Sequence, residues 1–176
     1  MEDLKHIIRD VPDFPKPGIL FKDIAPLLQN KETFQQAIDA IAMQWAEQQI
    51  DVVAGIEARG FLFAAALAYK IGAGVVMIRK PGKLPYKTYS ITYQLEYGAD
   101  SLEIHQDAVA PGQNVLIVDD VLATGGTMEA VIELLQNFDA NICGVAFLAE
   151  LAFLNGREKL SGHRLTTLMT FYTLNG

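Results

Sequence analysis

Two adjacent carboxylates stand at the end of an apolar run and just before a turn with two glycines. The segment reads Val115-Leu-Ile-Val-Asp-Asp-Val-Leu-Ala-Thr-Gly-Gly-Thr127. Ionised carboxylates only accept hydrogen bonds, so Asp119 and Asp120 suit the vicinal hydroxyls of a ribose and repel phosphate. A capped strand-turn-helix would explain Gly125 and Thr127 but not two acids directly after an apolar strand. The segment therefore predicts a site for a sugar phosphate.

The turn at residues 123–127, called the phosphate turn below, has the donors that a phosphate needs. Gly125 and Gly126 permit a tight turn and close approach of backbone N–H groups to a ligand. The helix expected from about Thr127 adds partial positive charge at its start. The residues expected to bind phosphate are Ala123, Thr124, Gly125, Gly126 and Thr127.

A cluster of positive charges stands out against an acidic chain. The formal net charge is −7 and the isoelectric point is near 4.9, which argues against general nucleic-acid binding, since such proteins usually have a basic face. Arg79, Lys80, Lys83 and Lys87 nevertheless lie within nine residues. Such a loop could bind a small anion, although charge alone favours a solvated loop.

The elements that must position these residues follow from apolar periodicity. Helical spacing predicts a helix over about 32–48, a largely apolar one over 61–71 and a third from about Thr127. A short starting helix is expected around Leu4 to Ile8, and three prolines and a glycine predict a loop over 11–18. Short apolar runs predict strands over 52–56, 75–78, 115–118, 143–148 and 165–174.

Apolar strands that alternate with helices predict an α/β fold: an open, mainly parallel twisted sheet with helices on both faces. Residues 88–105 instead alternate around a turn at 98–100, which indicates an antiparallel hairpin that stands off the sheet as a flap. Ligands of open α/β sheets bind beyond the carboxyl ends of the strands. The segments expected there are 57–60, 79–83, 119–127 and 150–151.

The length of 176 residues fits a single domain, residues 1–176. Its apolar runs fall far short of the ~20 residues of a membrane-spanning helix, and its first residues lack the apolar stretch of a signal peptide. We expect a cytoplasmic protein that does not bind membranes. The single cysteine, Cys143, lies in an apolar stretch, so a buried, inert thiol is expected.

Six further blocks make the sequence recognisable. They are Pro12-Asp-Phe-Pro-Lys-Pro-Gly18, Phe21-Lys-Asp-Ile24, Gly55-Ile-Glu-Ala-Arg-Gly-Phe-Leu-Phe63, Ile78-Arg-Lys-Pro-Gly-Lys-Leu-Pro85, Leu95-Glu-Tyr-Gly98 and Gly156-Arg-Glu-Lys-Leu160. The segment at 115–127 resembles the motif with which type I phosphoribosyltransferases bind phosphoribosyl pyrophosphate (PRPP). With the six blocks, nearly the whole chain resembles the adenine phosphoribosyltransferase family. The resemblance implies conversion of adenine and PRPP to AMP and pyrophosphate.

The resemblance assigns pyrophosphate to two segments. Backbone N–H groups of residues 57–60 would bind it, with Arg59 as a side-chain partner and a non-proline cis peptide at Glu57–Ala58. Residues of the basic segment would meet it too, in related enzymes sometimes from the neighbouring subunit, which implies a homodimer. The implied pyrophosphate contacts are Glu57, Ala58, Arg59, Gly60, Arg79, Lys80 and Lys83.

The resemblance also implies a base site and a flap. The base site would include an N-terminal segment at about 11–26, in which Phe21 could sandwich a flat purine against Leu151. The implied adenine contacts are Leu20, Phe21, Lys22, Glu150 and Leu151. The flap, at about 84–106, would carry Glu96 as general acid/base, with Tyr93 and Tyr97 closing over the substrate. Glu96 and Arg79 are the implied catalytic residues.

The resemblance implies that Mg²⁺ enters with PRPP rather than at a built-in metal site. His6, His105 and His163 are scattered, without the spacing of metal ligands. Two alternatives stay open at this point. One is a phosphoribosyltransferase for another base: xanthine, guanine, hypoxanthine or orotate. The other is a PRPP-sensing regulator that binds nucleic acid, which the acidic isoelectric point and the lack of an added helix-turn-helix disfavour.

Overall fold

A five-stranded parallel sheet forms the centre of the protein, in the strand order β4-β3-β7-β8-β9. The computed structural model describes residues 2–94 and 98–173. The strands of this sheet are β3 (Val52–Ile56), β4 (Gly74–Ile78), β7 (Asn114–Leu122), β8 (Asn141–Leu151) and β9 (Leu165–Phe171).

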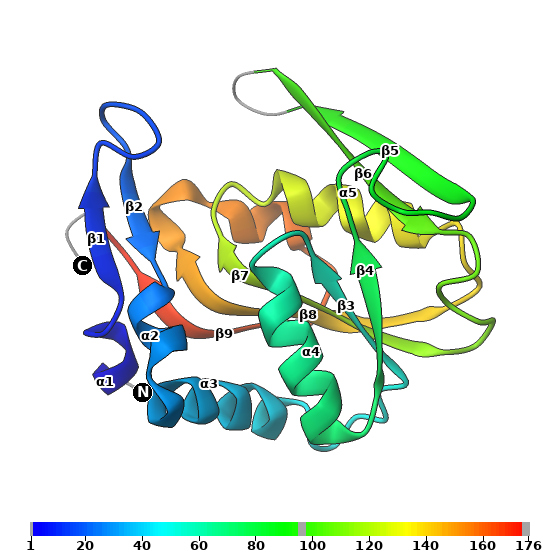
Figure 1. The fold of residues 1–176 in the computed structure, drawn as a ribbon, viewed down its shortest axis with the longest axis horizontal. Coiled ribbons are helices and arrows are strands. Elements are labelled where there is room, and N and C mark those ends of the chain that lie inside the picture. The colour runs from blue at the N-terminus through cyan, green and yellow to red at the C-terminus, as the bar shows by residue number, and fades with distance from the viewer. Residues whose placement is uncertain (1, 95–97, 174–176) are drawn as a thin grey trace.

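Helices cover both faces of the sheet, as predicted (Figure 1). On one face, α3 (Lys31–Gln44) and α4 (Gly60–Ile71) pack through buried side chains such as Ile41 and Phe63. On the other face, α5 (Gly126–Leu135) packs on alternate residues of the same strands, among them Val115 and Ile117. The sheet is thus enclosed by two apolar layers, which explains the near-continuous apolar runs of its strands.

The predicted flap is an antiparallel hairpin of β5 (Thr88–Gln94) and β6 (Ala99–His105). It stands off the main sheet and lies over α5 (Figure 1). The Tyr89 ring meets the Phe138 ring edge to face, with centroids 5.5 Å apart. At the end away from its tip, the hairpin is therefore anchored on the segment that follows α5.

The loop predicted over residues 11–18 is present over 13–18, where it connects the two strands of a second hairpin, and residues 11 and 12 belong to the first of these strands. Strand β1 (Arg9–Pro12) pairs antiparallel with β2 (Leu20–Asp23), and the connection contains a cis peptide at Phe14–Pro15. The strand at 9–12 is largely exposed and has no apolar alternation that could have revealed it. The remaining elements are α1 (Glu2–Lys5), α2 (Ala25–Gln29) and the 3-10 helices η1 (Ala152–Leu154) and η2 (Gly156–Leu160).

Two central strands are longer than their apolar runs. Strand β7 continues through Asp119 and Asp120 to Leu122, and β8 continues to Leu151. The pair of acids and Glu150 therefore lie in strands rather than in the loops where the sequence placed them. Helix α3 ends at Gln44, short of the predicted 48, and Cys143 is half-buried rather than buried.

Among the helices that the structure describes, each is too short or too polar to cross a membrane.

Candidate active site

The segments predicted to bind ligand meet at the carboxyl edge of the sheet. The turn at 57–59 follows β3, the basic loop (residues 79–83) follows β4, and the phosphate turn follows β7. Because these strands are parallel and adjacent, their ends bring the three segments to one edge. The predicted cis peptide at Glu57–Ala58 is present in the first of them.

The phosphate turn encloses a small cavity in front of the start of α5. The cavity measures about 80 Å³ and is lined by the turn together with Asp119 and Phe147. Gly125 has a φ of 81°, a left-handed conformation that favours glycine. N–H groups at the start of a helix make a ready site for an anion. The structure thus gives this turn the shape that the sequence predicted.

The two acids of β7 have different surroundings. Asp119 lines the small cavity, and its Oδ1 atom accepts a hydrogen bond from the backbone N–H of Asp120 at 2.9 Å. Burial, followed by the charge of Asp120, raises the pKa of Asp119 well above its ordinary value. Burial also raises the pKa of Asp120, although the Arg59 guanidinium opposes this.

Asp120 forms an ion pair with Arg59, with Oδ2 and Nε 2.7 Å apart. The contact lacks hydrogen-bond geometry, and the buried Oδ2 atom has no hydrogen-bond partner within residues 2–94 and 98–173. The Arg59 guanidinium also lies 4.8 Å from the centre of the Phe21 ring. Arg59 therefore links the turn after β3, the acid of β7 and the β1–β2 hairpin.

The basic loop is organised by Glu57. The Glu57 carboxylate accepts hydrogen bonds from Arg79 Nε at 3.3 Å, from the backbone N–H of Lys80 at 3.0 Å, and from Lys83 Nζ. These contacts, led by Lys83, lower the pKa of Glu57 to about 2. Lys80 forms an ion pair with Asp100 of β6. The cationic side chains predicted to meet pyrophosphate are thus gathered and oriented by carboxylates.

A cleft of about 410 Å³, called the base cleft below, opens beside the phosphate turn. Leu20, Phe21 and Leu151, predicted to hold the base, all line it. Its lining is Gly18, Ile19, Leu20, Phe21, Lys22, Arg59, Val121, Ala123, Thr124, Leu151, Phe153 and Leu154. Val121, Ala123 and Thr124 line the phosphate cavity as well, so the two spaces adjoin.

Two residues of the predicted base site have other partners. The buried Lys22 ammonium pairs with Asp10 at 2.6 Å and lies 4.4 Å from the centre of the Phe171 ring. Glu150 does not line the base cleft; its carboxylate is bound by Arg157, with Nε–Oε1 3.0 Å and Nη2–Oε2 2.5 Å. Neighbouring residues of a strand point to opposite faces, so Leu151 reaches the cleft and Glu150 does not.

The sequence did not predict three walls of the base cleft: Arg59, Phe153 and Leu154. The apolar character of Phe153 and Leu154, directly after Leu151, was the available signal. The flap comes near the phosphate turn at Tyr93, whose hydroxyl lies 3.3 Å from Thr127 Oγ1. Glu96 and Tyr97 lie outside the described residues.

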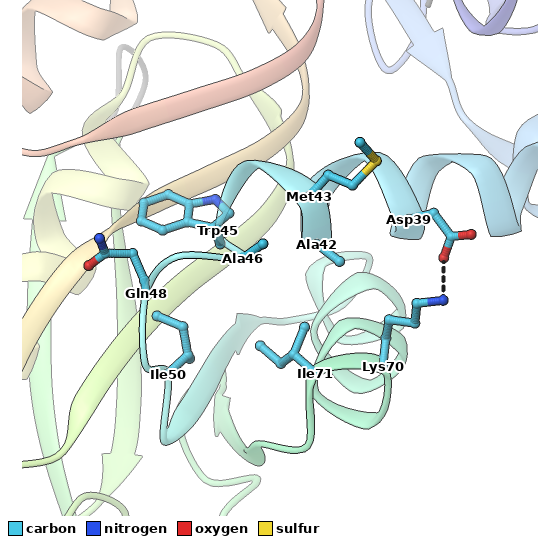
Figure 2. Close-up of a pocket in the computed structure, with 9 residues that line it drawn as sticks. All are labelled: Asp39, Ala42, Met43, Trp45, Ala46, Gln48, Ile50, Lys70 and Ile71. Carbon is cyan, nitrogen blue, oxygen red and sulfur yellow. Dashed lines mark ion pairs between the residues drawn. The ribbon is translucent and has the colours of Figure 1, made fainter.

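A separate cleft of about 550 Å³ lies between the ends of α3 and α4, at the amino-terminal edge of β3 (Figure 2). Ile50, Ile71 and Trp45 line it, and the Asp39–Lys70 ion pair, 3.0 Å long, lies at its other end. This cleft contains none of the predicted site residues, so the size of a cavity does not locate the chemistry here.

The fold and this edge define a phosphoribosyltransferase: residues 26–163 match the family model described as "Phosphoribosyl transferase domain". An adenine phosphoribosyltransferase from Geobacter metallireducens is 58% identical over 97% of this chain and 100% of its own length. The crystal structure of adenine phosphoribosyltransferase from Thermoanaerobacter pseudethanolicus is 51% identical, with a TM-score of 0.94 over 97% of this chain and 99% of its own. The Saccharomyces cerevisiae enzyme, complexed with adenine and an imino-altritol bisphosphate, is 42% identical, with a TM-score of 0.87 over 96% of both chains. The chain therefore belongs to the adenine phosphoribosyltransferase family.

Proposed function

We propose that this enzyme transfers the phosphoribosyl group of PRPP to adenine and releases AMP and pyrophosphate. The observation that carries the proposal is the shared wall of the base cleft and the phosphate cavity, formed by Val121, Ala123 and Thr124. A nucleotide needs a base site and a 5′-phosphate site separated by one ribose. The similarity to the yeast enzyme, which was crystallised with adenine, supports adenine as the base.

The ribose would lie between these two sites, against the acids of β7. The buried Asp120 Oδ2 atom, without a hydrogen-bond partner among the described residues, offers an acceptor for a ribose hydroxyl. Asp119 lies at the phosphate cavity and offers a second acceptor. Burial raises the pKa of both acids. A positive charge beside them favours the ionised form and would lower the pKa again, so ionised acids here suit a cationic neighbour.

In the proposed reaction, the bond from ribose C1 to pyrophosphate breaks and its electron pair leaves with pyrophosphate. Purine N9 then forms the new bond to C1, and the proton that N9 carried, shifted to N7, passes to the acid/base of the flap. No covalent nucleophile is required, so catalysis consists of positioning and charge stabilisation. Arg79 and Lys83 would bind the leaving pyrophosphate, and the two acids would face the developing positive charge on the ribose.

The flap would supply the acid/base. By family resemblance we assign this role to Glu96, which would hydrogen-bond near N7 while the N9 proton is lost. Tyr93 and Tyr97 would close over the substrate and exclude water. The contact of the Tyr93 hydroxyl with Thr127 supports the part of this proposal that concerns Tyr93, because it brings the hairpin to the phosphate turn.

We propose Mg²⁺ as the metal and PRPP as its carrier. Mg²⁺ is typically bound by one or two carboxylates together with substrate phosphates and water, and Asp119 and Asp120 are the carboxylates at this site. Bound there, Mg²⁺ would neutralise charge on the leaving pyrophosphate. Within the described ranges, no three His, Cys, Asp or Glu side chains group into a metal site.

We also propose a homodimer, from an exposed apolar surface next to the basic loop. Leu62 and Tyr69 of α4 are 48% and 93% exposed, and Val75 and Met77 of the edge strand β4 are each 46% exposed. Helix α4 contacts β4, so these side chains belong to one region, and apolar patches of this kind mark association sites. Tyr69→Glu should shift the sedimenting mass from dimer to monomer, while Met43→Glu, at a 78% exposed position of α3, should not.

We place the enzyme in the cytoplasm, since its one cysteine offers no intramolecular disulfide. Cell fractionation tests this location. The activity itself is tested by supplying PRPP, Mg²⁺ and one free base at a time, and by identifying the product by mass spectrometry. We expect AMP from adenine; turnover of guanine, hypoxanthine, xanthine or orotate in preference to adenine would refute the proposal.

A further inference from the structure

The block Gly156–Leu160, which forms η2, has no part in the function described so far. Its backbone lies directly against the phosphate turn. A Cβ atom added at Gly156 would lie 2.1 Å from Ala123 O and 2.9 Å from Gly125 N. A Cβ atom added at Gly125 would lie 2.4 Å from Gly156 O. The two backbones therefore touch without room for a side chain on either. Gly156 does not line the phosphate cavity, so η2 supports the turn from outside that cavity.

The two glycines are constrained for different reasons. Gly125 has a positive φ as well as this close contact, so its replacement would change backbone conformation and packing together. Gly156 is not among the glycines with positive φ, so the close contact alone demands glycine there. Gly156→Ala therefore tests the contact without forcing an unfavourable backbone conformation.

The residue after Gly156 fixes η2 to the sheet. Arg157 binds the Glu150 carboxylate through two hydrogen bonds of 3.0 and 2.5 Å, and the Glu150 side chain is only 6% exposed. A guanidinium that binds a carboxylate at two points fixes orientation as well as distance. Leu151, next to Glu150 in β8, lines the base cleft. The ion pair thus ties the backbone under the phosphate turn to the strand that carries a wall of the base cleft.

The other end of η2 is held by α5. Leu160 is 2% exposed and belongs to the apolar cluster that contains Met128 and Val131 of α5. Helix η2 is therefore anchored to β8 at one end and to α5 at the other, with Gly156 against the turn that leads into α5.

We propose that Gly156 and the Glu150–Arg157 pair are positioning residues that set the phosphate turn at its working distance from the base cleft. This positioning proposal rests on the proposed function. It gives Glu150 a structural role with Arg157 in place of the adenine contact predicted from the sequence. Moving the turn should weaken the binding of the PRPP 5′-phosphate most, because the base cleft shares only Ala123 and Thr124 with the turn and keeps Leu20, Phe21 and Leu151 in place. The signature is a rise in KM for PRPP without an equal rise in KM for adenine.

The test compares steady-state kinetics of Gly156→Ala, Arg157→Ala, Arg157→Lys and the wild type, with each substrate varied against saturating Mg²⁺ and co-substrate. A displacement of about 1 Å can cost about a hundredfold, so kcat/KM for PRPP should fall about tenfold to a hundredfold in Gly156→Ala. The kcat/KM for PRPP of Arg157→Lys should lie between those of wild type and Arg157→Ala, because lysine keeps the charge but not the two-point contact. Glu158→Ala, at an exposed neighbour in η2, is the matched control and should behave as wild type.

A folded Gly156→Ala with wild-type KM for PRPP would overturn the proposal, as would equal rises in KM for both substrates. If Gly156→Ala does not fold, the Arg157 series decides: Arg157→Lys and Arg157→Ala with the same KM for PRPP as wild type would refute the positioning. Wild-type turnover separates the two levels of inference. If the wild type makes no AMP, the proposed function fails; if it does and the variants match it, only the positioning proposal fails.

Discussion

Glu57→Gln should destabilise the protein, and the loss should depend on pH. The Glu57 side chain is 11% exposed, and its carboxylate accepts hydrogen bonds from Lys83 Nζ, Arg79 Nε and the backbone N–H of Lys80. Glutamine keeps the shape of the side chain but removes its negative charge. The substitution therefore removes the charge and turns one acceptor oxygen into a donor, so it tests the hold of the carboxylate on the basic loop.

The magnitude follows from the pKa of Glu57, which falls from 4.5 to about 2 on folding. One pKa unit corresponds to 1.36 kcal/mol, so a shift of this size gives an upper limit of about 3 kcal/mol. The Lys83 and Arg79 side chains are 48% and 28% exposed, however. Solvent screening weakens pairs of this kind, so we expect a loss of about 1–2 kcal/mol at neutral pH.

The pH dependence has a definite sign. A carboxyl whose pKa is lowered on folding stabilises the folded state above its unfolded pKa, and this stabilisation is lost as pH falls through the folded value. The difference between wild type and Glu57→Gln should be full above about pH 5 and should shrink steadily toward about pH 2. Urea unfolding followed by circular dichroism, from neutral pH down to the lowest pH at which both proteins fold, measures this difference.

Glu47→Gln is the matched control, since Glu47 is an exposed carboxylate after α3 and should show no such trend. A Glu57→Gln loss of the same size at every pH would refute the electrostatic account, because a packing defect does not titrate. Wild-type stability at neutral pH would refute it as well. The variant should also raise KM for PRPP, since Arg79 and Lys83 lose the group that orients them.

Three further predictions concern chemistry and selectivity. Glu96→Gln should lower single-turnover rates by ~10²–10⁴-fold, as for a positioned acid/base, with little change in Tm; rates near wild type would leave Glu96 without a catalytic role. Phe21→Ala should weaken every purine alike, whereas Leu20→Ala should keep the adenine-to-hypoxanthine ratio of kcat/KM, because we expect backbone groups to read the purine edge; a changed ratio would show that the side chain reads it. Exhaustive chelation should abolish turnover and added Mg²⁺ should restore it; full activity after chelation would exclude the metal.

The sequence predicted the fold because its central strands are buried on both faces and its helices keep apolar spacing. It predicted the ends of these strands less well. Asp119, Asp120 and Glu150 were placed in loops, although each continues a parallel strand: β7 stays paired with β8 beyond the end of β3, and β8 is paired on both sides at Glu150. Polar residues occur at the end of a strand, but they also occur within a strand where it borders a ligand site. An apolar run therefore gives only the minimum length of such a strand.

The hairpin of β1 and β2 was missed for a related reason. Its segment contains Pro12, Pro15 and Pro17, which predict a loop, and β1 has no apolar alternation because it is largely exposed. This two-stranded unit nevertheless places Leu20 and Phe21 at the base cleft. The contacts within the site were equally hidden, because Arg59–Asp120 and Glu150–Arg157 depend on which side of a strand each residue faces.

The charge pairing of the site explains why a carboxylate occurs in a segment expected to bind pyrophosphate. All four basic residues predicted to contact pyrophosphate, Arg59, Arg79, Lys80 and Lys83, are paired with carboxylates in the structure. These partners, Asp120, Glu57 and Asp100, limit repulsion among the cations and hold them in one place. Phosphate oxygens can then replace or share a carboxylate partner. Side chains that are already ordered lose less conformational entropy on binding than free ones. For the proposed pyrophosphate site, we therefore expect the order that Glu57 imposes on the cations around it to offset the repulsion between Glu57 and pyrophosphate.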